Sequence, residues 1–312
     1  MQSMKAVQIN NYGGTGTLVL NDAPRPTAGD GEILIRVQAT TVNPFDCAVR
    51  AGYVTGWYTY SFPAILGLDV SGVVEEVGPG VSSFAPGDEV YARTDPKSNG
   101  AYAEYVAVPA SEVALKPASL DHFQAAALPQ VGLTAWRALF DAAQLTEGQT
   151  ILIHGAAGGV GSVAVQLAKW RGAKVIGTAS THNLDFLREL GVDTAIDYTT
   201  TRFEDEAHAV DVVLDTVGGE TQERSWGVLK PGGILLSLVQ PPSQETADKF
   251  GVRQQFVGGN PPAGAILSEI ASLVDTGHVK PVVSTILPLK DIQKAHAMVE
   301  SRHTRGKVVL RV

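Results

Sequence analysis

The sequence Thr150-Ile-Leu-Ile-His-Gly-Ala-Ala-Gly-Gly-Val-Gly161 decides the fold of this chain. Its apolar run breaks into glycines and leads directly into Ser162–Trp170, which has a helical pattern. This order predicts a buried strand, a tight turn and a helix start. Gly155, Gly158 and Gly161 leave room for the turn, for the approach of a pyrophosphate and for packing of the helix on the strand. Because a helix start offers N–H groups and a positive dipole end, we expect a dinucleotide here.

The spacing of these glycines is one residue longer than the common G-x-G-x-x-G pattern, and glycine clusters also occur in ordinary turns. The surrounding sequence therefore matters. Lys174–Ala179 has the pattern of the next strand, after a helix of about a dozen residues. A strand, a helix and a strand within about 30 residues form the unit expected around a dinucleotide. This unit favours a nucleotide site over a bare structural turn.

Length and composition suit a globular protein with two domains. The chain has 312 residues, of which 44% are hydrophobic and 18% are charged. It has no apolar run of about 18 residues, and its N-terminus leads into a strand pattern without a signal-peptide core. We therefore expect a soluble, cytoplasmic protein with no membrane partner. A net charge of −8 without a basic block gives little support for a nucleic-acid partner.

Cysteine and histidine usage argues against a metal site. Cys47 is the only cysteine, which excludes a disulfide within the chain and a thiolate zinc cluster. We expect its side chain to be a buried filler, with a reactive thiol as the less favoured alternative. The seven histidines lack the paired spacing of a metal-binding helix. No metal is expected.

The first hundred residues consist mainly of short β-branched runs bounded by glycine and proline. The candidate strands are residues 5–9, 32–37, 70–77, 88–91 and 103–108. Gly78-Pro-Gly80 and Pro86-Gly-Asp88 predict turns between them. No long helical pattern interrupts these runs, so they predict a compact antiparallel barrel or sandwich.

From about residue 119 the pattern becomes helical and then alternates between strand and helix. Helical spacing covers 121–127 and 131–143, and strands are expected at Ile151, Val175, 194–197, 210–214 and 233–239, with a sixth at 255–257. This alternation predicts an α/β fold with a doubly wound parallel sheet. Helices at 263–275 and 290–300 follow. A last strand at 307–312 could rejoin the first domain.

Three motifs in this order resemble the medium-chain dehydrogenase/reductase superfamily: Gly67–Gly80, Gly87-Asp88-Glu-Val and Gly155–Gly161. Across essentially the whole chain, the segments most similar to zinc-independent quinone oxidoreductases are Val42–Asp46, Leu128–Trp136 and Glu300–Gly306. The resemblance implies a GroES-like β-rich barrel as the catalytic domain, over residues 1–125 and 260–312. It implies a Rossmann dinucleotide-binding domain over residues 126–259.

Two departures from the zinc enzymes of that superfamily bear on the chemistry. A metal-binding cysteine stands there where this chain has Asn43, and Gly-His-Glu stands where it has Gly67-Leu68-Asp69. An amide and a leucine thus replace two metal ligands, and no Lewis acid would hold an alkoxide. The resemblance therefore implies hydride transfer to a quinone or an α,β-unsaturated carbonyl, because a conjugated acceptor spreads the incoming charge.

The segment after the second strand, Thr178–Asn183, bears on the choice of cofactor. It has no acid before Asp185 that would hold a ribose 2′-hydroxyl and repel a 2′-phosphate. We therefore expect NADPH rather than NADH. The segment also lacks a basic partner for the phosphate, since Leu184 falls near a lysine of many relatives. The substitutes that remain are His182, Arg302 and Arg305.

The resemblance also implies individual site residues. Those expected to bind the cofactor are Thr134, Gly155, Gly158, Gly159, Val160, Gly161, Ser180, Tyr198, Val217 and Arg302. Each has a structural alternative: Thr134 as a cap at a helix start, Tyr198 as a half-buried aromatic and Arg302 as a solvated residue. The glycines after Val217 could form an ordinary turn.

Asn43 and Tyr53 are the catalytic candidates. Asn43 is the best polar group for the nicotinamide side. Tyr53 belongs with Tyr58 and Tyr60 to a cluster that could shape the substrate wall, donate a proton or form a surface loop packed on itself. Asp46 is expected to order the local turn rather than act as a base.

We therefore expect an NADPH-dependent reductase of a small-molecule quinone or enone. The alternatives are a reductase of 2-alkenals or enoyl thioesters and a non-catalytic binder that senses NADPH. Homodimerisation through the edge strand of the nucleotide domain is common in the family and is allowed here.

Overall fold

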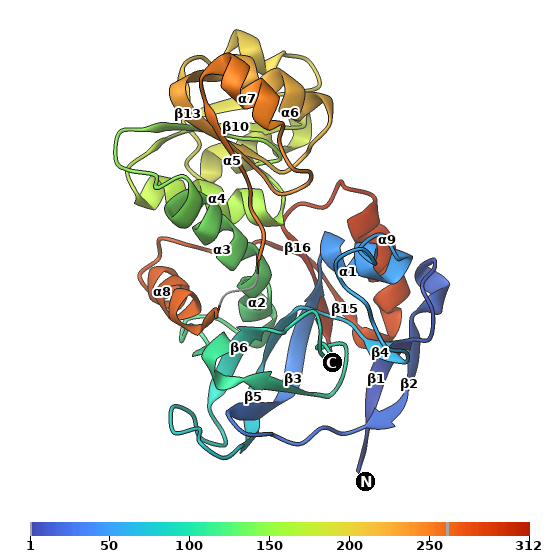
Figure 1. The fold of residues 1–312 in the computed structure, drawn as a ribbon. Helices are drawn as coiled ribbons and strands as arrows, with labels where there is room; N and C mark the ends of the chain where they lie inside the picture. The colour runs from blue at the N-terminus through green and yellow to red at the C-terminus, as the bar shows by residue number, and fades with distance from the viewer. Residues whose placement is uncertain (1, 260–261) are drawn as a thin grey trace. The chain divides into compact units, whose positions relative to one another are not determined.

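A computed structural model describes residues 2–259 and 262–312 of the chain. Contacts divide the chain into two compact units, and Figure 1 traces their elements. Unit 1 comprises Met1–Gln130, Asn260–Thr276 and Pro281–Val312, and unit 2 comprises Val131–Gly259 and Gly277–Lys280. The domain bounds inferred from the sequence stay predictions. The inferred boundary at residue 260 lies outside the described residues.

Unit 2 is built on a parallel sheet whose strands follow the order β11-β10-β9-β12-β13-β14. The strands are β9 (Thr150–Ile153), β10 (Lys174–Ala179), β11 (Thr194–Asp197), β12 (Val210–Asp215), β13 (Leu229–Ser237) and β14 (Arg253–Phe256). Their order reverses between β9 and β12, which is where doubly wound sheets bind ligands at the carboxyl ends of the strands. The doubly wound α/β fold expected from the sequence is confirmed.

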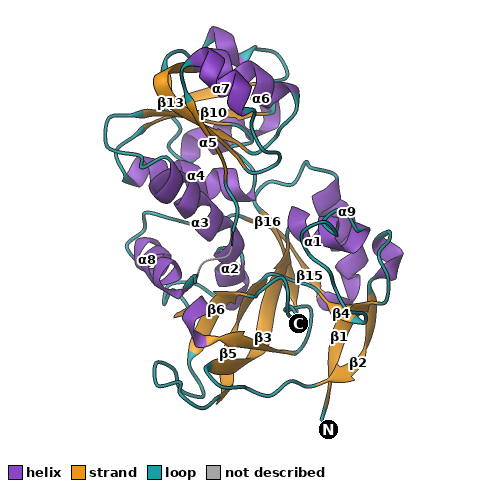
Figure 2. Ribbon diagram, viewed as in Figure 1, coloured by secondary structure: helices purple, strands orange, loops and turns teal. Residues whose placement is uncertain are grey.

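Helices cover both faces of this sheet. In Figure 2, α6 and α7 lie on one side of β10 and β13, and α4 lies on the other. The helices of this region are α3 (Pro129–Trp136), α4 (Gly159–Trp170), α5 (Leu184–Glu189), α6 (Glu220–Ser225) and α7 (Gln244–Phe250). The helix expected over 131–143 differs, because α3 passes into a wider π-helical turn over Arg137–Ala142. The core between α6, α7 and the sheet includes Leu152, Val213 and Trp226.

Unit 1 contains a larger sheet with the order β15-β16-β3-β5-β6-β8, and β7 also pairs with β3. These strands are β3 (Glu32–Val42), β5 (Asp69–Val77), β6 (Glu89–Arg93), β7 (Tyr105–Pro109), β8 (Val113–Leu115), β15 (Val283–Pro288) and β16 (Lys307–Arg311). A small sheet has the order β2-β1-β4, formed by β1 (Ser3–Ile9), β2 (Val19–Pro24) and β4 (Ala64–Ile65). The last strand, β16, pairs antiparallel with β3, so the chain end rejoins the first domain as expected.

Four helices of unit 1 pack on these sheets: α1 (Pro44–Ala51), α2 (His122–Ala126), α8 (Gly264–Asp275) and α9 (Ile292–Glu300). The sequence did not predict α1. Pro44 suits its first position, Asp46 accepts a hydrogen bond from the Asn43 N–H, and Gly52 ends it with φ +84°. Within the described residues, no helix is long and apolar enough to cross a membrane.

Candidate functional site

The three glycines of the turn after β9 have three different environments. Gly155 has φ +66°, and a Cβ there would lie 2.5 Å from Thr216 Oγ1. A Cβ at Gly161 would lie 2.3 Å from the Gly155 carbonyl oxygen and 2.7 Å from Ala156 Cα. A Cβ at Gly158 would meet only the Gly155 oxygen, at 3.3 Å. Gly155 therefore serves the turn, Gly161 the packing of helix on strand, and Gly158 an open approach to the backbone.

The turn leads into the N-terminus of α4, and Gly158 is its N-cap without a side-chain hydrogen bond. Gly159, Val160 and Gly161 form the first turn, whose N–H groups have no partner within a helix. These N–H groups and the helix dipole suit a phosphate. The cradle of backbone at the centre of a doubly wound sheet thus fits the pyrophosphate of a dinucleotide.

Side-chain hydrogen bonds fix the backbone of this turn to neighbouring elements. Thr216 Oγ1 donates to the His154 carbonyl at 2.8 Å, one residue before Gly155. The His154 ring lies between Thr178 Oγ1 at 3.1 Å and Ser225 Oγ at 3.0 Å. Burial lowers the pKa of His154 to about 4, so the imidazole is neutral. The turn is therefore fixed to the neighbouring strands before any ligand binds.

The loop after β12 is fixed by the buried carboxylate of Asp215. One oxygen accepts from the N–H groups of Val217 at 2.9 Å and Gly218 at 2.8 Å. The other accepts from Gln222 Nε2 and Ser237 Oγ, both at 3.1 Å. The Val217 side chain stays exposed. Because β12 pairs with β9, this loop and the glycine turn end neighbouring strands at the same edge of the sheet.

The end of β10 carries a cluster of small polar groups. Ser180 Oγ lies 3.3 Å from His182 Nδ1 and accepts from Asn183 Nδ2 at 3.2 Å. Tyr198 follows β11 directly and is 56% exposed. These are the side chains that sequence reasoning assigned to the adenosine phosphate. An acid also lies here: Asp197 accepts from Thr181 Oγ1 at 2.6 Å.

In unit 1, the two positions that would carry zinc ligands have other surroundings. Asn43 is 2% exposed; its Oδ1 accepts from Lys307 Nζ at 2.5 Å, and its Nδ2 donates to Asp69 Oδ2 at 2.8 Å. Lys307 Nζ also lies 3.4 Å from Asp69 Oδ2. Leu68 is buried. An ammonium and a carboxylate therefore form a buried ion pair bridged by the Asn43 amide.

Asp69 receives further hydrogen bonds in this cluster. Thr41 Oγ1 donates to Asp69 Oδ2, and the Gln130 N–H donates to Asp69 Oδ1 at 2.6 Å. Three other donors thus share one buried carboxylate with Lys307. A buried ion pair requires this degree of satisfaction to offset the loss of hydration of its charges.

Asp46 connects this cluster to α1. Its carboxyl accepts from the Asn43 N–H at 2.8 Å and from the Gly67 N–H at 3.2 Å. Burial raises the pKa of Asp46 to about 6, and the Asp69 charge adds to that shift. These contacts order the local turn, the role expected from the sequence.

The remaining predicted residues lie in separate places. Tyr53 is 82% exposed, while the neighbouring Tyr58 packs edge-on against Phe45 with ring centroids 5.4 Å apart. Thr134 lies inside α3, which begins at Pro129, so the alternative of a cap at a helix start was wrong. Arg302 is exposed and has φ +59°. The roles of Tyr53, Thr134 and Arg302 in binding or catalysis stay predictions.

Cys47 lies in a buried contact rather than at a surface. Its Sγ is 3.4 Å from His296 Nδ1, and His296 Nε2 lies 3.2 Å from the Tyr102 hydroxyl. Burial raises the pKa of Cys47 to about 12 and lowers the pKa of His296 to about 3. The thiol and the imidazole are both neutral at physiological pH, which suits the expected filler and leaves no thiolate nucleophile.

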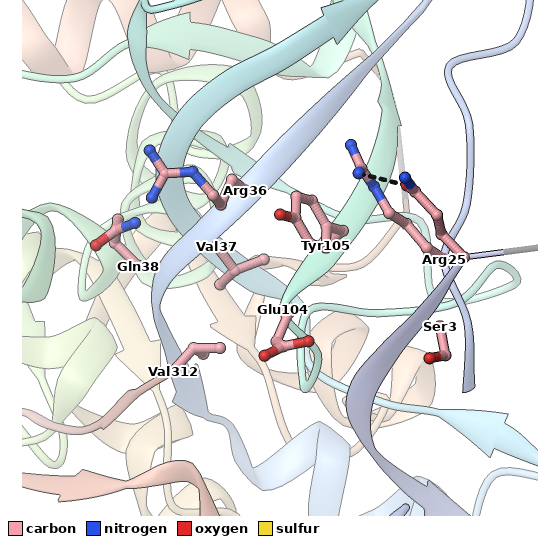
Figure 3. Close-up of a pocket in the computed structure, with 9 residues that line it drawn as sticks. Ser3, Arg25, Arg36, Val37, Gln38, Glu104, Tyr105 and Val312 are labelled. Atoms are coloured by element: carbon pink, nitrogen blue, oxygen red, sulfur yellow. Dashed lines mark hydrogen bonds between the residues drawn. The ribbon is translucent and has the colours of Figure 1, made fainter. Parts of the chain in front are cut away.

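Unit 1 also has an open polar hollow of about 480 Å³, shown in Figure 3. Arg25 lies on its wall with the guanidinium 4.2 Å from the centroid of the Tyr105 ring. The same guanidinium is 3.2 Å from Glu75 and 3.0 Å from Glu76, and Arg36 lies 3.6 Å from Glu75. Arg25 and Arg36, the cations that line the hollow, are thus already paired with carboxylates, and neither offers an unpaired positive charge to an anion.

A zinc ion does not fit the donor set. No group of three or more His, Cys, Asp or Glu side chains in residues 2–259 and 262–312 is arranged to hold a metal ion. Asn43 and Leu68 are poor zinc ligands, and the Lys307 ammonium beside them repels a cation.

Two important residues were missed by the sequence analysis. Asp197 ends a strand that was expected, and carboxyl ends of neighbouring parallel strands meet at one edge, so its position beside Ser180 could have been inferred. Lys307 opens a strand whose next three residues are apolar, which signals a buried charge that needs a partner. Nothing in the sequence names that partner, because Asp69 lies 238 residues away.

Comparisons with known proteins agree with this architecture. The model of the family described as "Alcohol dehydrogenase GroES-like domain" matches residues 29–118, which confirms the GroES-like domain expected from the resemblance. The model described as "Zinc-binding dehydrogenase" matches residues 190–310. The fold is also similar to that of a quinone oxidoreductase from Coxiella burnetii, with a TM-score of 0.92, 34% identity and coverage of 100% of both chains.

Two curated relatives are similar over most of their length. NAD(P)H oxidoreductase RTN4IP1, mitochondrial, from Mus musculus is 37% identical over 90% of this chain and 82% of the relative. NADPH-dependent alkenal/one oxidoreductase, chloroplastic, from Arabidopsis thaliana is 36% identical over 99% of this chain and 80% of the relative. The chain therefore belongs to the medium-chain dehydrogenase/reductase superfamily and is an oxidoreductase with a nicotinamide cofactor, similar to the quinone and alkenal/one oxidoreductases of that superfamily.

Proposed function

We propose that the chain is a zinc-independent reductase that uses NADPH to reduce a quinone or an α,β-unsaturated carbonyl. The buried cluster of Asn43, Lys307 and Asp69 carries the proposal, because Asn43 stands where the zinc enzymes have a metal-binding cysteine and is held there by an ammonium and a carboxylate. Without a Lewis acid, oxidation of a simple alcohol lacks a group to hold the alkoxide. A conjugated acceptor needs less help, since its own π system spreads the charge.

Cofactor binding follows from unit 2. Bound NADPH supplies the hydride. The open backbone at Gly158 and the first turn of α4 hold the pyrophosphate, and Ser180 and Tyr198 border the adenosine. The Asp215 carboxylate keeps the Val217 loop in place for the nicotinamide end. The order of side chains after β10, with hydroxyls and no acid before Asp185, favours NADPH over NADH.

The catalytic roles rest on unit 1. Asn43 is the amide that would meet an oxyanion of the substrate; its Nδ2 donates to Asp69 at 2.8 Å and its side chain also bonds the Asp46 carboxyl, so the oxyanion would have to replace one of these contacts. The Lys307 ammonium on Oδ1 polarises the amide and strengthens this donor. Tyr53 is exposed and can reach a substrate that arrives from solvent. Neither role requires a metal or a general base of high basicity.

The names of the relatives favour quinones and alkenals over enoyl thioesters as substrates. One is named for alkenals and enones, and another fold neighbour for quinones, which all present a conjugated carbonyl. An enoyl-CoA substrate would need a basic entrance, and the chain carries a net charge of −8 without a basic block. We therefore rank enoyl thioesters below quinones and alkenals.

A comparison of acceptors tests the proposal. NADPH oxidation is followed with 1,4-naphthoquinone, a 2-alkenal and crotonyl-CoA, and NADP⁺ reduction is followed with a simple primary alcohol, before and after exhaustive chelation. We expect turnover with the first two that survives chelation. Tight NADPH binding without oxidation by any acceptor would instead favour the cofactor-sensing binder.

Location and assembly stay predictions. We propose a cytoplasmic protein, although relatives are named as mitochondrial and chloroplastic. A homodimer would form through β14, which ends the strand order of unit 2. Sedimentation of Gln254→Pro tests this, because Val257 donates to Ser237 on β13 and the N–H of Gln254 therefore lies on the outer side of β14.

A further inference from the structure

A carboxylate reaches the adenosine end of the proposed cofactor site from a neighbouring strand. β11 runs parallel to β10, and Asp197 pairs in register with Ala179, the residue before Ser180. The acid that is missing after β10 in the sequence is therefore supplied in space by β11. It therefore lies beside the strand end after which an acid discriminates between a ribose 2′-hydroxyl and a 2′-phosphate.

The contacts of Asp197 show how it can act. Oδ2 accepts from Thr181 Oγ1 at 2.6 Å, and Oδ1 accepts from Thr199 Oγ1 at 2.6 Å and from the Thr199 N–H at 3.0 Å. These donors lower the pKa of Asp197, so it is ionised at neutral pH. Both oxygens are occupied by the protein. The carboxylate therefore acts on a ligand mainly through its charge and not as a hydrogen-bond acceptor.

The cations near this turn do not cancel that charge. Arg188 on α5 pairs with Asp185 at 2.6 Å, and Arg202 lies 3.3 Å from Glu204. His182 is the titratable group that faces Asp197 electrostatically. Among the described residues of unit 2 whose contacts place them at this turn, a 2′-phosphate would meet the fixed negative charge of Asp197 and the imidazole of His182.

We propose that Asp197 is a selectivity residue that keeps the preference for NADPH over NADH small, so that the chain accepts both cofactors. The inference rests on the proposed function, which places the adenosine ribose beside Ser180. The phosphate is doubly charged, and a partly screened carboxylate disfavours it by about three- to tenfold. NADH lacks the phosphate and does not experience this repulsion.

Binding measurements on Asp197→Asn test the inference without relying on turnover. Asparagine is isosteric, its oxygen can still accept from Thr199, and its amide can donate to Thr181, so the turn is kept. Dissociation constants for NADPH and NADH are measured by calorimetric titration at low and high salt. For the wild type we expect the two constants to lie within about tenfold of each other. In Asp197→Asn, the dissociation constant for NADPH should fall about three- to tenfold and the dissociation constant for NADH should stay unchanged.

The control is Asp193→Asn, which removes the same charge at the amino end of β10. Asp193 pairs with Lys169 at 2.8 Å and accepts from the Val175 N–H at 2.7 Å, away from the carboxyl edge. Its ratio of NADPH to NADH affinity should equal that of the wild type. Asp197→Ser serves as a second variant if the asparagine variant melts early.

An unchanged affinity ratio in folded Asp197 variants would overturn the inference, and so would a wild-type preference for NADPH above about a hundredfold. Both results would leave the proposed function standing. If the wild type bound neither cofactor, the proposed function itself would fail.

Discussion

Gly161→Ala should lower the stability of the fold, whereas Gly158→Ala should leave stability unchanged and weaken cofactor binding. A Cβ at Gly161 would lie 2.3 Å from the Gly155 oxygen and 2.7 Å from Ala156 Cα, both of them backbone atoms. An ordinary contact is near 3.4 Å, so the α4 start and the turn must separate by about 1 Å. Overpacking of this kind costs about 1–3 kcal/mol of unfolding free energy.

Gly158 offers the matched comparison three residues earlier. A Cβ there meets only one atom, at 3.3 Å, and Gly158 has a φ of −75°, which alanine adopts without strain. The fold should therefore tolerate alanine with a change below about 0.5 kcal/mol. The added methyl would, however, stand on the open backbone that the pyrophosphate approaches. We expect NADPH affinity to fall on the order of tenfold to a hundredfold.

Thermal melting and calorimetric titration with NADPH separate these effects. Gly161→Ala should lower the melting temperature by roughly 3–9 °C. Gly158→Ala should leave it unchanged and weaken binding. Gly227→Ala, exposed and with no atom near its Cβ, is the control that should change neither quantity. Wild-type affinity in Gly158→Ala, or wild-type melting in Gly161→Ala, would refute this assignment of the turn.

Two further variants test the buried polar cluster of unit 1. Lys307→Met leaves the Asp69 carboxylate without its cation and should lower the free energy of unfolding by about 3–5 kcal/mol, measured by chemical denaturation. The double variant Lys307→Met/Asp69→Asn should recover part of this loss. Equal stability of the single and double variants would contradict the pairing. Protonation of Asp46 contributes stability that is fully present below its unfolded pKa of 3.8 and is lost as pH rises through about 6. Relative to Asp46→Asn, the wild type should therefore lose about 3 kcal/mol between about pH 4 and about pH 7, measured by urea unfolding, and a difference independent of pH would contradict the raised pKa.

The elements with strong local patterns could be predicted from the sequence. β11 was expected at 194–197, its observed bounds, because a short β-branched run between turns has few other solutions. The glycine turn was also predictable, since its spacing follows from backbone clashes within a few residues. β2 and α1 were missed. β2 contains Asn21, Asp22 and Pro24, and α1 is only eight residues long.

The site was less predictable, because its contacts join distant segments. Asn43 was singled out from the sequence as a catalytic candidate, a role that stays a prediction, and its partner Lys307 comes from the last strand. Asp197 escaped because only the strand order places it beside Ser180. Asp215 accepts four hydrogen bonds, two from the Val217 loop itself, one from α6 and one from β13, and no local sequence pattern indicates them. Local sequence thus predicted elements, whereas pairing of buried charges required the fold.

The most direct test of the central claim follows the fate of the hydride. Chelator-treated protein of measured zinc content is incubated with C4-deuterated NADPH and an α,β-unsaturated ketone, and the product is examined by mass spectrometry and NMR. The account predicts deuterium on the β-carbon of the saturated ketone at a rate unaffected by chelation. A product without deuterium, or a rate that vanishes on chelation and returns with Zn²⁺, would contradict it.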